Sequence, residues 1–143
     1  MKVRAGIAII VVSFCLGLMC HQAVIGASSE EQAALESAGA WLALVDAGEY
    51  GKSWDEAASF FKGRLSKDQW EKALPTVRKP LGKVISRATG SAMYSKAVPG
   101  APDGQYVVIQ YNTSFENKKS AVETVTPMLD KDGKWRVSGY FIK

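Results

Sequence analysis

The chain is 143 residues long, and its 18 basic and 14 acidic side chains leave a net charge of +4. Its two cysteines and its single histidine, Cys15, Cys20 and His21, all lie near the amino terminus. The sequence that follows contains neither residue type, which excludes a disulfide framework, a Cys–His or Ser–His–Asp nucleophile, and the usual zinc ligands. No metal site and no cofactor are predicted.

The first 27 residues have the composition of a cleavable export signal. Lys2 and Arg4 precede an apolar run over residues 5–20, and small residues end the segment at Ala27. This order is typical of a secretory signal peptide, and we predict cleavage after Ala27. Two alternatives remain open: a retained membrane anchor, although the run is shorter than the roughly 20 residues of a bilayer span, and a lipoprotein attached at Cys20.

Residues 28–143 are therefore predicted to form one mature domain, periplasmic or secreted, with no membrane span. Loss of the two amino-terminal bases lowers the net charge to +2, and a nearly neutral exported domain is a poor match for nucleic acid. The charge is uneven, with a net of −6 over residues 28–61 and +6 from Lys62 to Arg87. This basic segment predicts a weak contact with an anionic surface; the alternative is a solvated helix face beside acidic helices.

Three helices are predicted first. In the first two, apolar residues recur at intervals of three and four, the pattern of a helix with one buried face. The helices are expected over residues 30–47, over residues 54–62, and in a third segment that Pro75 kinks or ends. Each begins at a capping box, a serine followed three residues later by glutamine or glutamate. The three boxes are Ser29 with Gln32, Ser53 with Glu56, and Ser66 with Gln69.

Strands are predicted for the rest of the chain. Residues 83–98 are expected to form one bent strand or a strand pair, with Gly90 at a bulge. A turn over residues 99–104 contains Asp-Gly, a strong hairpin signal, and alternating sequences follow it. The later strands are expected at residues 105–116, 120–129 and 134–142. Helices followed by an antiparallel meander indicate an α+β fold, in which the helices pack on a curved four-stranded sheet.

Five short runs, in this order and spacing, resemble the bacterial domain-of-unknown-function family 4019. The runs are residues 41–46, 50–54, 78–82, 99–106 and 132–140. Members of that family are small exported proteins with no assigned activity, so the resemblance implies boundaries and localisation and carries over no catalytic residue. More distantly, a Trp-bearing first helix and a C-terminal meander are similar to the cone-shaped NTF2-like fold, or to a cystatin-like arrangement, by fold analogy.

A ligand site is predicted where the helices face the curved sheet. Most of the four tryptophans are expected in the core, and Trp54 is a candidate to line a pocket. Arg87 and Arg136 lie on predicted strands and would clamp an anionic ligand, with Tyr94 as a further candidate; the alternative is outward projection and salt bridging. The loop over residues 99–104 is a second candidate, although its composition also suits a plain turn. Its candidate residues are Pro99, Gly100, Pro102, Asp103 and Gly104.

Two functions of different classes follow. The first is a non-catalytic binding module for an unknown small ligand or periplasmic protein, using the concave face of the sheet or the loop. The second is a histidine-free, NTF2-like enzyme with Asp46 or Asp55 as base and Tyr50 or Tyr94 as proton donor. A buried aspartate with a raised pKa would favour the enzyme, whereas exposed aspartates on helices would favour the binding module.

Overall fold

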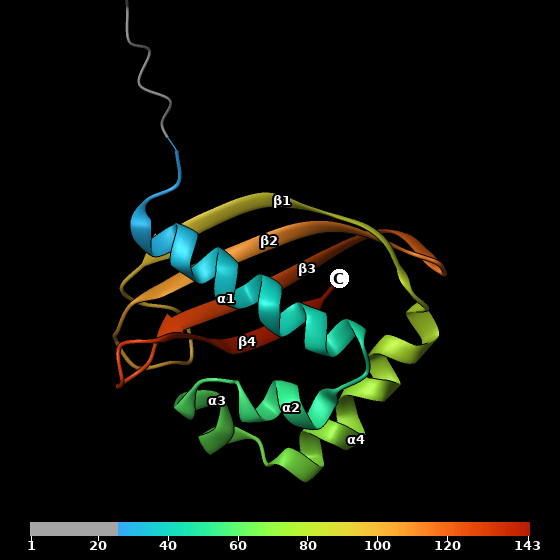
Figure 1. Ribbon diagram of the computed structural model, residues 1–143, viewed down its shortest axis with the longest axis horizontal. Coiled ribbons are helices and arrows are strands. Elements are labelled where there is room, and N and C mark those ends of the chain that lie inside the picture. Colours follow the sequence, from blue (N-terminus) through green and yellow to red (C-terminus); the bar gives the residue numbers. More distant parts are fainter. Residues whose placement is uncertain (1–25) are drawn as a thin grey trace, which may run out of the picture.

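The computed structural model describes residues 26–143, so the predicted export signal, with both cysteines and the histidine, lies outside the described residues except for its last two positions. Figure 1 shows α1 lying across the sheet, while α2, α3 and α4 gather beside β4. The elements are α1 (Ser29–Asp46), α2 (Tyr50–Asp55), α3 (Ser59–Arg64), α4 (Lys67–Arg78), a 3-10 turn (Lys79–Leu81), β1 (Val84–Ser95), β2 (Tyr106–Phe115), β3 (Lys118–Leu129) and β4 (Trp135–Ile142).

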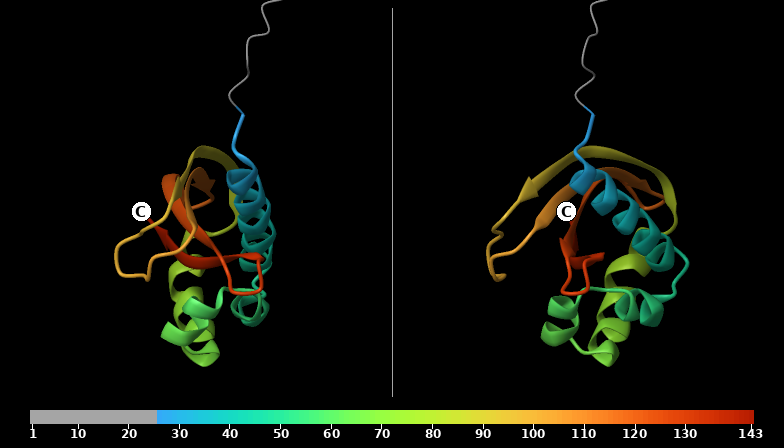
Figure 2. Two further views of the ribbon diagram at one scale, coloured as in Figure 1. Left: turned by 90° about the vertical axis from the view of Figure 1, so that its left-hand side faces the viewer. Right: turned by 60° about the vertical axis from the view of Figure 1, so that its left-hand side comes forward.

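The four strands form one antiparallel sheet in the order β1-β2-β3-β4. The sheet is curved, and the helices lie on its concave side (Figure 2). The predicted α+β class, with helices before a four-stranded antiparallel sheet, is therefore confirmed. The first strand is a single bent strand, and its register shifts at Gly90 as predicted. A side chain there would lie 3.0 Å from the Asn112 amide nitrogen, so the close approach of β2 favours glycine.

The core lies between α1 and the concave face of the sheet. From α1, the core contains the apolar residues that are spaced three and four apart. From each strand it contains every second residue, the ones whose side chains point toward the helices. Trp41 is 3% exposed at the centre of this core, which confirms its predicted place there. Its indole N–H donates to the Ser53 carbonyl oxygen at 2.7 Å. The main contributors are Ala34, Ala38, Leu42 and Val45 from α1, and Val107, Ile109, Val125 and Val137 from the sheet.

The second predicted helix is wrong, because the chain forms two short helices in its place. Ser53 is not a cap: it is fully buried inside α2 and accepts a hydrogen bond from the Trp70 indole at 2.9 Å. After α2 the Ala58 N–H donates to the Val137 carbonyl of β4 at 2.8 Å. A new helix then begins at Ser59, whose N–H donates to the Asp130 carboxylate at 2.9 Å. The helix is thus divided by contacts with Val137 and Asp130, which lie far along the chain. The local spacing of apolar residues cannot predict such contacts.

Two further boundaries differ from the predictions. The cap of α1 is Ser28, which forms a capping box with Glu31, one residue before the predicted pair. The helix α4 does begin at the predicted capping box of Ser66 and Gln69, but it continues through Pro75. Burial of Trp70 and Leu74 on α4, together with Arg78 at its last position, stabilises turns on both sides of the proline.

Candidate functional site

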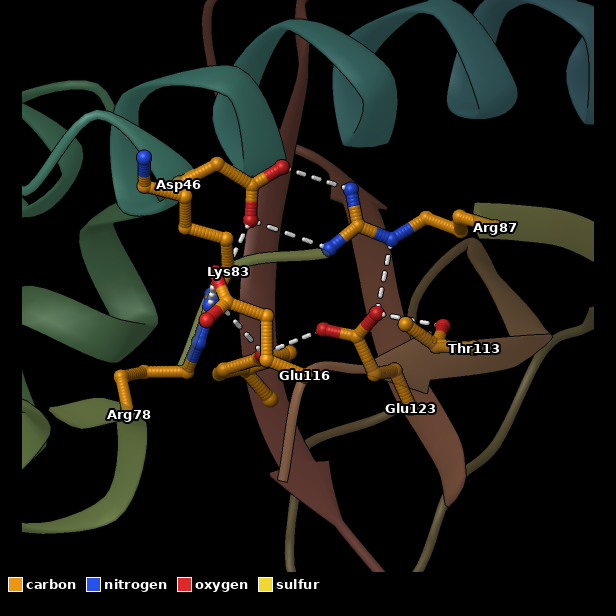
Figure 3. Close-up of polar contacts among 8 residues, drawn as sticks. Asp46, Arg78, Lys83, Arg87, Thr113, Glu116 and Glu123 are labelled. Atoms are coloured by element: carbon orange, nitrogen blue, oxygen red, sulfur yellow. Dashed lines mark hydrogen bonds and ion pairs between the residues drawn. The ribbon is translucent and has the colours of Figure 1, made fainter. Parts of the chain in front are cut away.

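An ion-pair network occupies the concave face of the sheet, between the ends of α1 and α4 and strands β1 and β3 (Figure 3). At its centre Arg87 lies between two carboxylates. Its Nη1 is 2.7 Å from Asp46 Oδ2 on α1, and its Nε is 2.7 Å from Glu123 Oε1 on β3. Arg78 makes a second ion pair with Asp46, also at 2.7 Å. Two positive and two negative side chains thus neutralise one another.

Neighbouring hydroxyl groups complete the network. Glu123 is fully buried, and it accepts hydrogen bonds from the Thr113 hydroxyl at 2.6 Å and from the Tyr140 hydroxyl. Arg78 is 6% exposed and its guanidinium lies over the Phe115 ring, 5.3 Å from the centroid. Within residues 26–143, Arg78 Nε is a buried nitrogen without a hydrogen-bond partner. The network occupies part of the space between helices and sheet where the sequence predicted a pocket, and a hollow of about 600 Å³ lined in part by Asp46 and Arg78 borders it.

The electrostatics of the network oppose proton transfer. Partial burial pushes the pKa of Asp46 upward, but hydrogen bonds and charges from Arg87 and Arg78 outweigh this effect, so its pKa lies below the usual value. Burial and the adjacent Glu123 carboxylate raise the pKa of Tyr140 well above its ordinary value. A general base near neutral pH needs a raised carboxylate pKa, and Asp46 has the opposite shift.

A separate hollow of about 560 Å³ lies between α1, α2 and the start of β4. We call it the tryptophan hollow. Its apolar lining includes a partly exposed Trp135 beside Ala40 and Leu44 on α1, with the buried Trp41 next to them. Ser37 also lines it and donates its hydroxyl hydrogen to the Trp135 carbonyl at 2.8 Å, which fixes β4 against α1. Its charged rim comprises Lys52, Asp55, Glu56, Lys134 and Arg136.

Arg136 lies on the rim of this hollow and not in the concave face. Its guanidinium is 2.6 Å from Asp132 and 3.6 Å from Asp130, both in the β3–β4 turn. The hydrogen bonds from Arg136 lower the pKa of Asp132 to about 2. Arg87 and Arg136 therefore do not form the predicted clamp, because each is engaged by its own carboxylates.

The other predicted ligand residues are separated as well. Tyr94 is on β1 with its hydroxyl 3.2 Å from the Gln105 side-chain oxygen. Trp54 donates its indole N–H to the Leu65 carbonyl at 2.7 Å, a structural contact that joins α2 to the end of α3. The loop over residues 99–104 contributes Pro102, Asp103 and Gly104 to a hollow of about 510 Å³ beside α3.

Of the proposed acid–base residues, Asp46 and Tyr50 line one hollow of about 600 Å³ beside the ion-pair network, whereas Asp55 and Tyr94 lie elsewhere. Asp46 belongs to the ion-pair network, whereas Asp55 is half-exposed on α2 and pairs with Lys67 at 2.8 Å. Tyr50 packs against the hydrophobic core, and Tyr94 contacts Gln105. Asp55 is thus exposed on a helix, whereas Asp46 is ion-paired and its side chain is only partly exposed, so one of the two aspartates meets the pattern named for a binding module.

The sequence analysis did not identify several residues of the ion-pair network and of the tryptophan hollow. Glu123 was not singled out, although it stands between Ala121 and Val125, which the alternation places on one face of a strand. An acidic residue at an inward position predicts a buried partner of opposite charge, and Arg87 on another strand was available. No comparable pattern in the sequence predicts that Lys134 and Trp135 line the tryptophan hollow, because they directly follow a turn.

The described residues contain no helix long and apolar enough to cross a membrane, and no cluster of three acidic residues suited to a metal ion. The chain is thus an α+β domain with one closed polar network and an open hollow at the helix–sheet seam. Residues 37–140 match the model of a protein family described as a protein of unknown function, DUF4019, and the chain belongs to that family. No curated protein matches it.

Proposed function

We propose that this protein is an exported, non-catalytic binding module that holds its ligand in the tryptophan hollow. The observation that carries the proposal is the lining of that hollow, in which Trp135, Ala40 and Leu44 provide apolar surface and charged side chains form the rim. Apolar surface with a few placed polar groups is typical of ligand sites. A partly exposed tryptophan also offers a large rigid contact at little entropic cost.

The position of the charges supports binding over catalysis. Asp46 and Glu123, the acids of the ion-pair network, are each held by arginine. Asp55, at the rim of the hollow, is paired with Lys67. Asp46 has a lowered pKa and does not line the hollow, and Asp55, which lines it, is already ion-paired, so the Asp–Tyr enzyme receives no support from this hollow.

Export, with cleavage after Ala27, is part of the proposal. Ser28 would then be the first residue of the mature protein. Its hydroxyl oxygen accepts a hydrogen bond from the Glu31 N–H at 3.2 Å, so Ser28 caps α1 directly after the proposed cleavage site. Mass spectrometry of the exported protein should give a mass that begins at Ser28. A mass that includes His21, or a lipid on Cys20, would contradict cleavage at this position.

The binding site can be tested by NMR with a library of small aromatic acids and amines as probes. We expect binders to shift the Trp135 indole N–H and the Ser37 amide first. Ala40→Phe fills the hollow from an exposed helix position and should abolish these shifts. Ala43→Phe is the matched control, because Ala43 is exposed on the same helix and does not line the hollow. Shifts that survive Ala40→Phe, or no binder at all, would overturn the proposed site.

A further inference from the structure

Most of the charged rim of the tryptophan hollow is neutralised by residues outside the hollow. Three of its five charged side chains have such a partner at 2.6–2.9 Å, in the pairs Lys52–Glu49, Asp55–Lys67 and Arg136–Asp132. The other two are Glu56 and Lys134, which form no ion pair and no side-chain hydrogen bond among residues 26–143. The hollow therefore presents one free acid and one free base.

Glu56 and Lys134 come from different elements and do not pair with each other. Glu56 caps the end of α2 and Lys134 directly precedes β4, and both are exposed. Each acts at a distance on the Arg136–Asp132 pair. After the hydrogen bonds of that pair itself, the charge of Glu56 adds to the raised pKa of Arg136, and the charge of Lys134 adds to the lowered pKa of Asp132. The two free groups thus line one hollow beyond ion-pair distance of each other.

The uncharged part of the lining leaves no further polar side chain to orient a ligand. The Ser37 hydroxyl donates to the Trp135 carbonyl, and the Trp41 indole N–H donates to the Ser53 carbonyl. The remaining surface of the hollow is apolar. A ligand with a single charge would use either the free carboxylate or the free ammonium group and leave the other to water. A ligand with both an ammonium group and a carboxylate would use the two together.

We propose that the tryptophan hollow binds a zwitterion with an apolar body, either a free apolar α-amino acid or a short apolar peptide with free termini. Its ammonium group pairs with Glu56, its carboxylate pairs with Lys134, and its apolar side chain packs against Trp135. The volume of about 560 Å³ lies within the usual range of ligand sites. This inference rests on the proposed function, because it names the ligand class of the same site.

Titrations followed at the Trp135 indole N–H by NMR test the proposal. The ligands are leucine, dileucine and trileucine, each with free ends, with the amine acetylated, or with the carboxylate converted to an amide. For the ligand of best length, we expect each blocked end to weaken binding about threefold, within the range that an exposed ion pair contributes. The best length separates an amino-acid site from a peptide site. Equal affinity of the free and blocked forms would overturn the inference.

Variants assign each end of the ligand to its partner. In Glu56→Gln the free and acetylated forms should bind equally, while the amide remains weaker than the free form. In Lys134→Gln the free and amide forms should bind equally, while the acetylated form remains weaker. Glu71→Gln and Lys131→Gln are the matched controls, because these residues are exposed and do not line the hollow. A Glu56 or Lys134 variant that keeps both differences, or loses both, would contradict the assignment.

The outcomes also separate this inference from the proposed function. If the small aromatic probes bind the tryptophan hollow and are blocked by Ala40→Phe, but the free and blocked leucine ligands bind equally or not at all, the proposed function stands and the zwitterion inference fails. If ligands bind and Ala40→Phe has no effect on any of them, the tryptophan hollow is not the site and both fail.

Discussion

The ion-pair network and the tryptophan hollow contain the same kinds of side chain in different surroundings. In the network Glu123 is fully buried and Arg87 lies between two carboxylates. In the hollow the side chain of Asp55 is 49% exposed, and Lys134 forms no ion pair among the described residues. Burial makes an unpaired charge costly, so the interior is neutral. Water tolerates unpaired charge, so charge available to a ligand is found at the seam.

This difference explains why arginines alone are a poor guide to a binding site. Arg87 and Arg136 look alike in the sequence, because both lie on strands and both were expected to meet an anion. Arg87 already has its anions, one of them completely removed from solvent. Arg136 borders the tryptophan hollow, but it makes its two shortest contacts with Asp132. Lys134, on the same rim, forms no ion pair among the described residues.

The largest effect should come from removing the buried acid of the network. Glu123→Ala leaves Arg87 Nε and the Tyr140 hydroxyl without their acceptor, while Asp46 still pairs with the other end of the guanidinium. Breaking a buried pair typically costs about 3–5 kcal/mol. Urea unfolding, followed by tryptophan fluorescence, measures the loss. A variant within about 1 kcal/mol of the wild type would show that solvent already screens the network.

A smaller loss should follow from Asp46→Asn, which keeps the shape and removes the charge shared by Arg78 and Arg87. Hydrogen bonds to charged groups contribute about 1.5–3 kcal/mol, and Asp46 is partly exposed, so we expect the lower part of this range. Asp55→Asn is the matched control, because its pair with Lys67 is exposed on both sides. Equal losses for the two variants in urea unfolding would contradict the distinction between the regions.

The pH dependence of stability should be confined to the two ends of the scale. Asp46, Asp130 and Asp132 have lowered pKa values in the folded protein, so their contribution is complete above the unfolded pKa of about 4. It is lost as pH falls through the folded values. Tyr140 has a raised pKa, so its contribution is complete below the unfolded value of about 10 and is lost at higher pH.

We therefore expect the unfolding free energy to be flat between about pH 5 and pH 9, since these limits stand one unit inside the unfolded values. Asp46→Asn should reduce the acid-side loss, because one of the groups with a lowered pKa is gone. Thermal melts across the pH range measure both effects. A steep change near pH 6 to 7, where histidine ordinarily titrates, would show that His21 contributes to the folded protein.

The smallest effect on stability should come from the rim of the tryptophan hollow. Arg136→Ala removes a partly exposed pair with Asp132, and such pairs contribute about 0.2–1 kcal/mol. Urea unfolding measures this loss. A loss of stability as large as that of Glu123→Ala would place Arg136 with the buried network.

Much of the fold was predictable because it depends on local patterns. The helix of α1, the capping box at Ser66, the bulge at Gly90 and the alternation of β2 each follow from spacing or residue type within a short window. The division between α2 and α3 was not predictable in this way. It depends on Val137 and Asp130, which reach Ala58 and Ser59 from the other end of the chain.

The candidate site was harder to predict than the fold. The sequence analysis proposed arginines and tryptophans as ligand residues, but these residue types occur both in cores and in ligand sites. Only the burial of each side chain in the folded protein distinguishes the two roles. Trp41 and Trp54 donate their indole N–H groups to backbone carbonyls, whereas Trp135 is partly exposed beside the tryptophan hollow. The inward acid at Glu123 was the one sequence signal that, followed through, would have identified the network.

The first helix is joined to the last strand by contacts that span almost the whole chain. Ser37 and Trp135 are separated by 98 residues, and Ser59 and Asp130 by 71. The ribosome synthesises the amino terminus first. Trp135, which contacts α1, and Asp130, whose carboxylate binds the first residue of α3, are therefore made much later than the helices they contact. Folds that depend on such distant contacts form slowly. A newly made chain therefore stays open until its final strand is complete, which suits a protein proposed to cross a membrane before it folds.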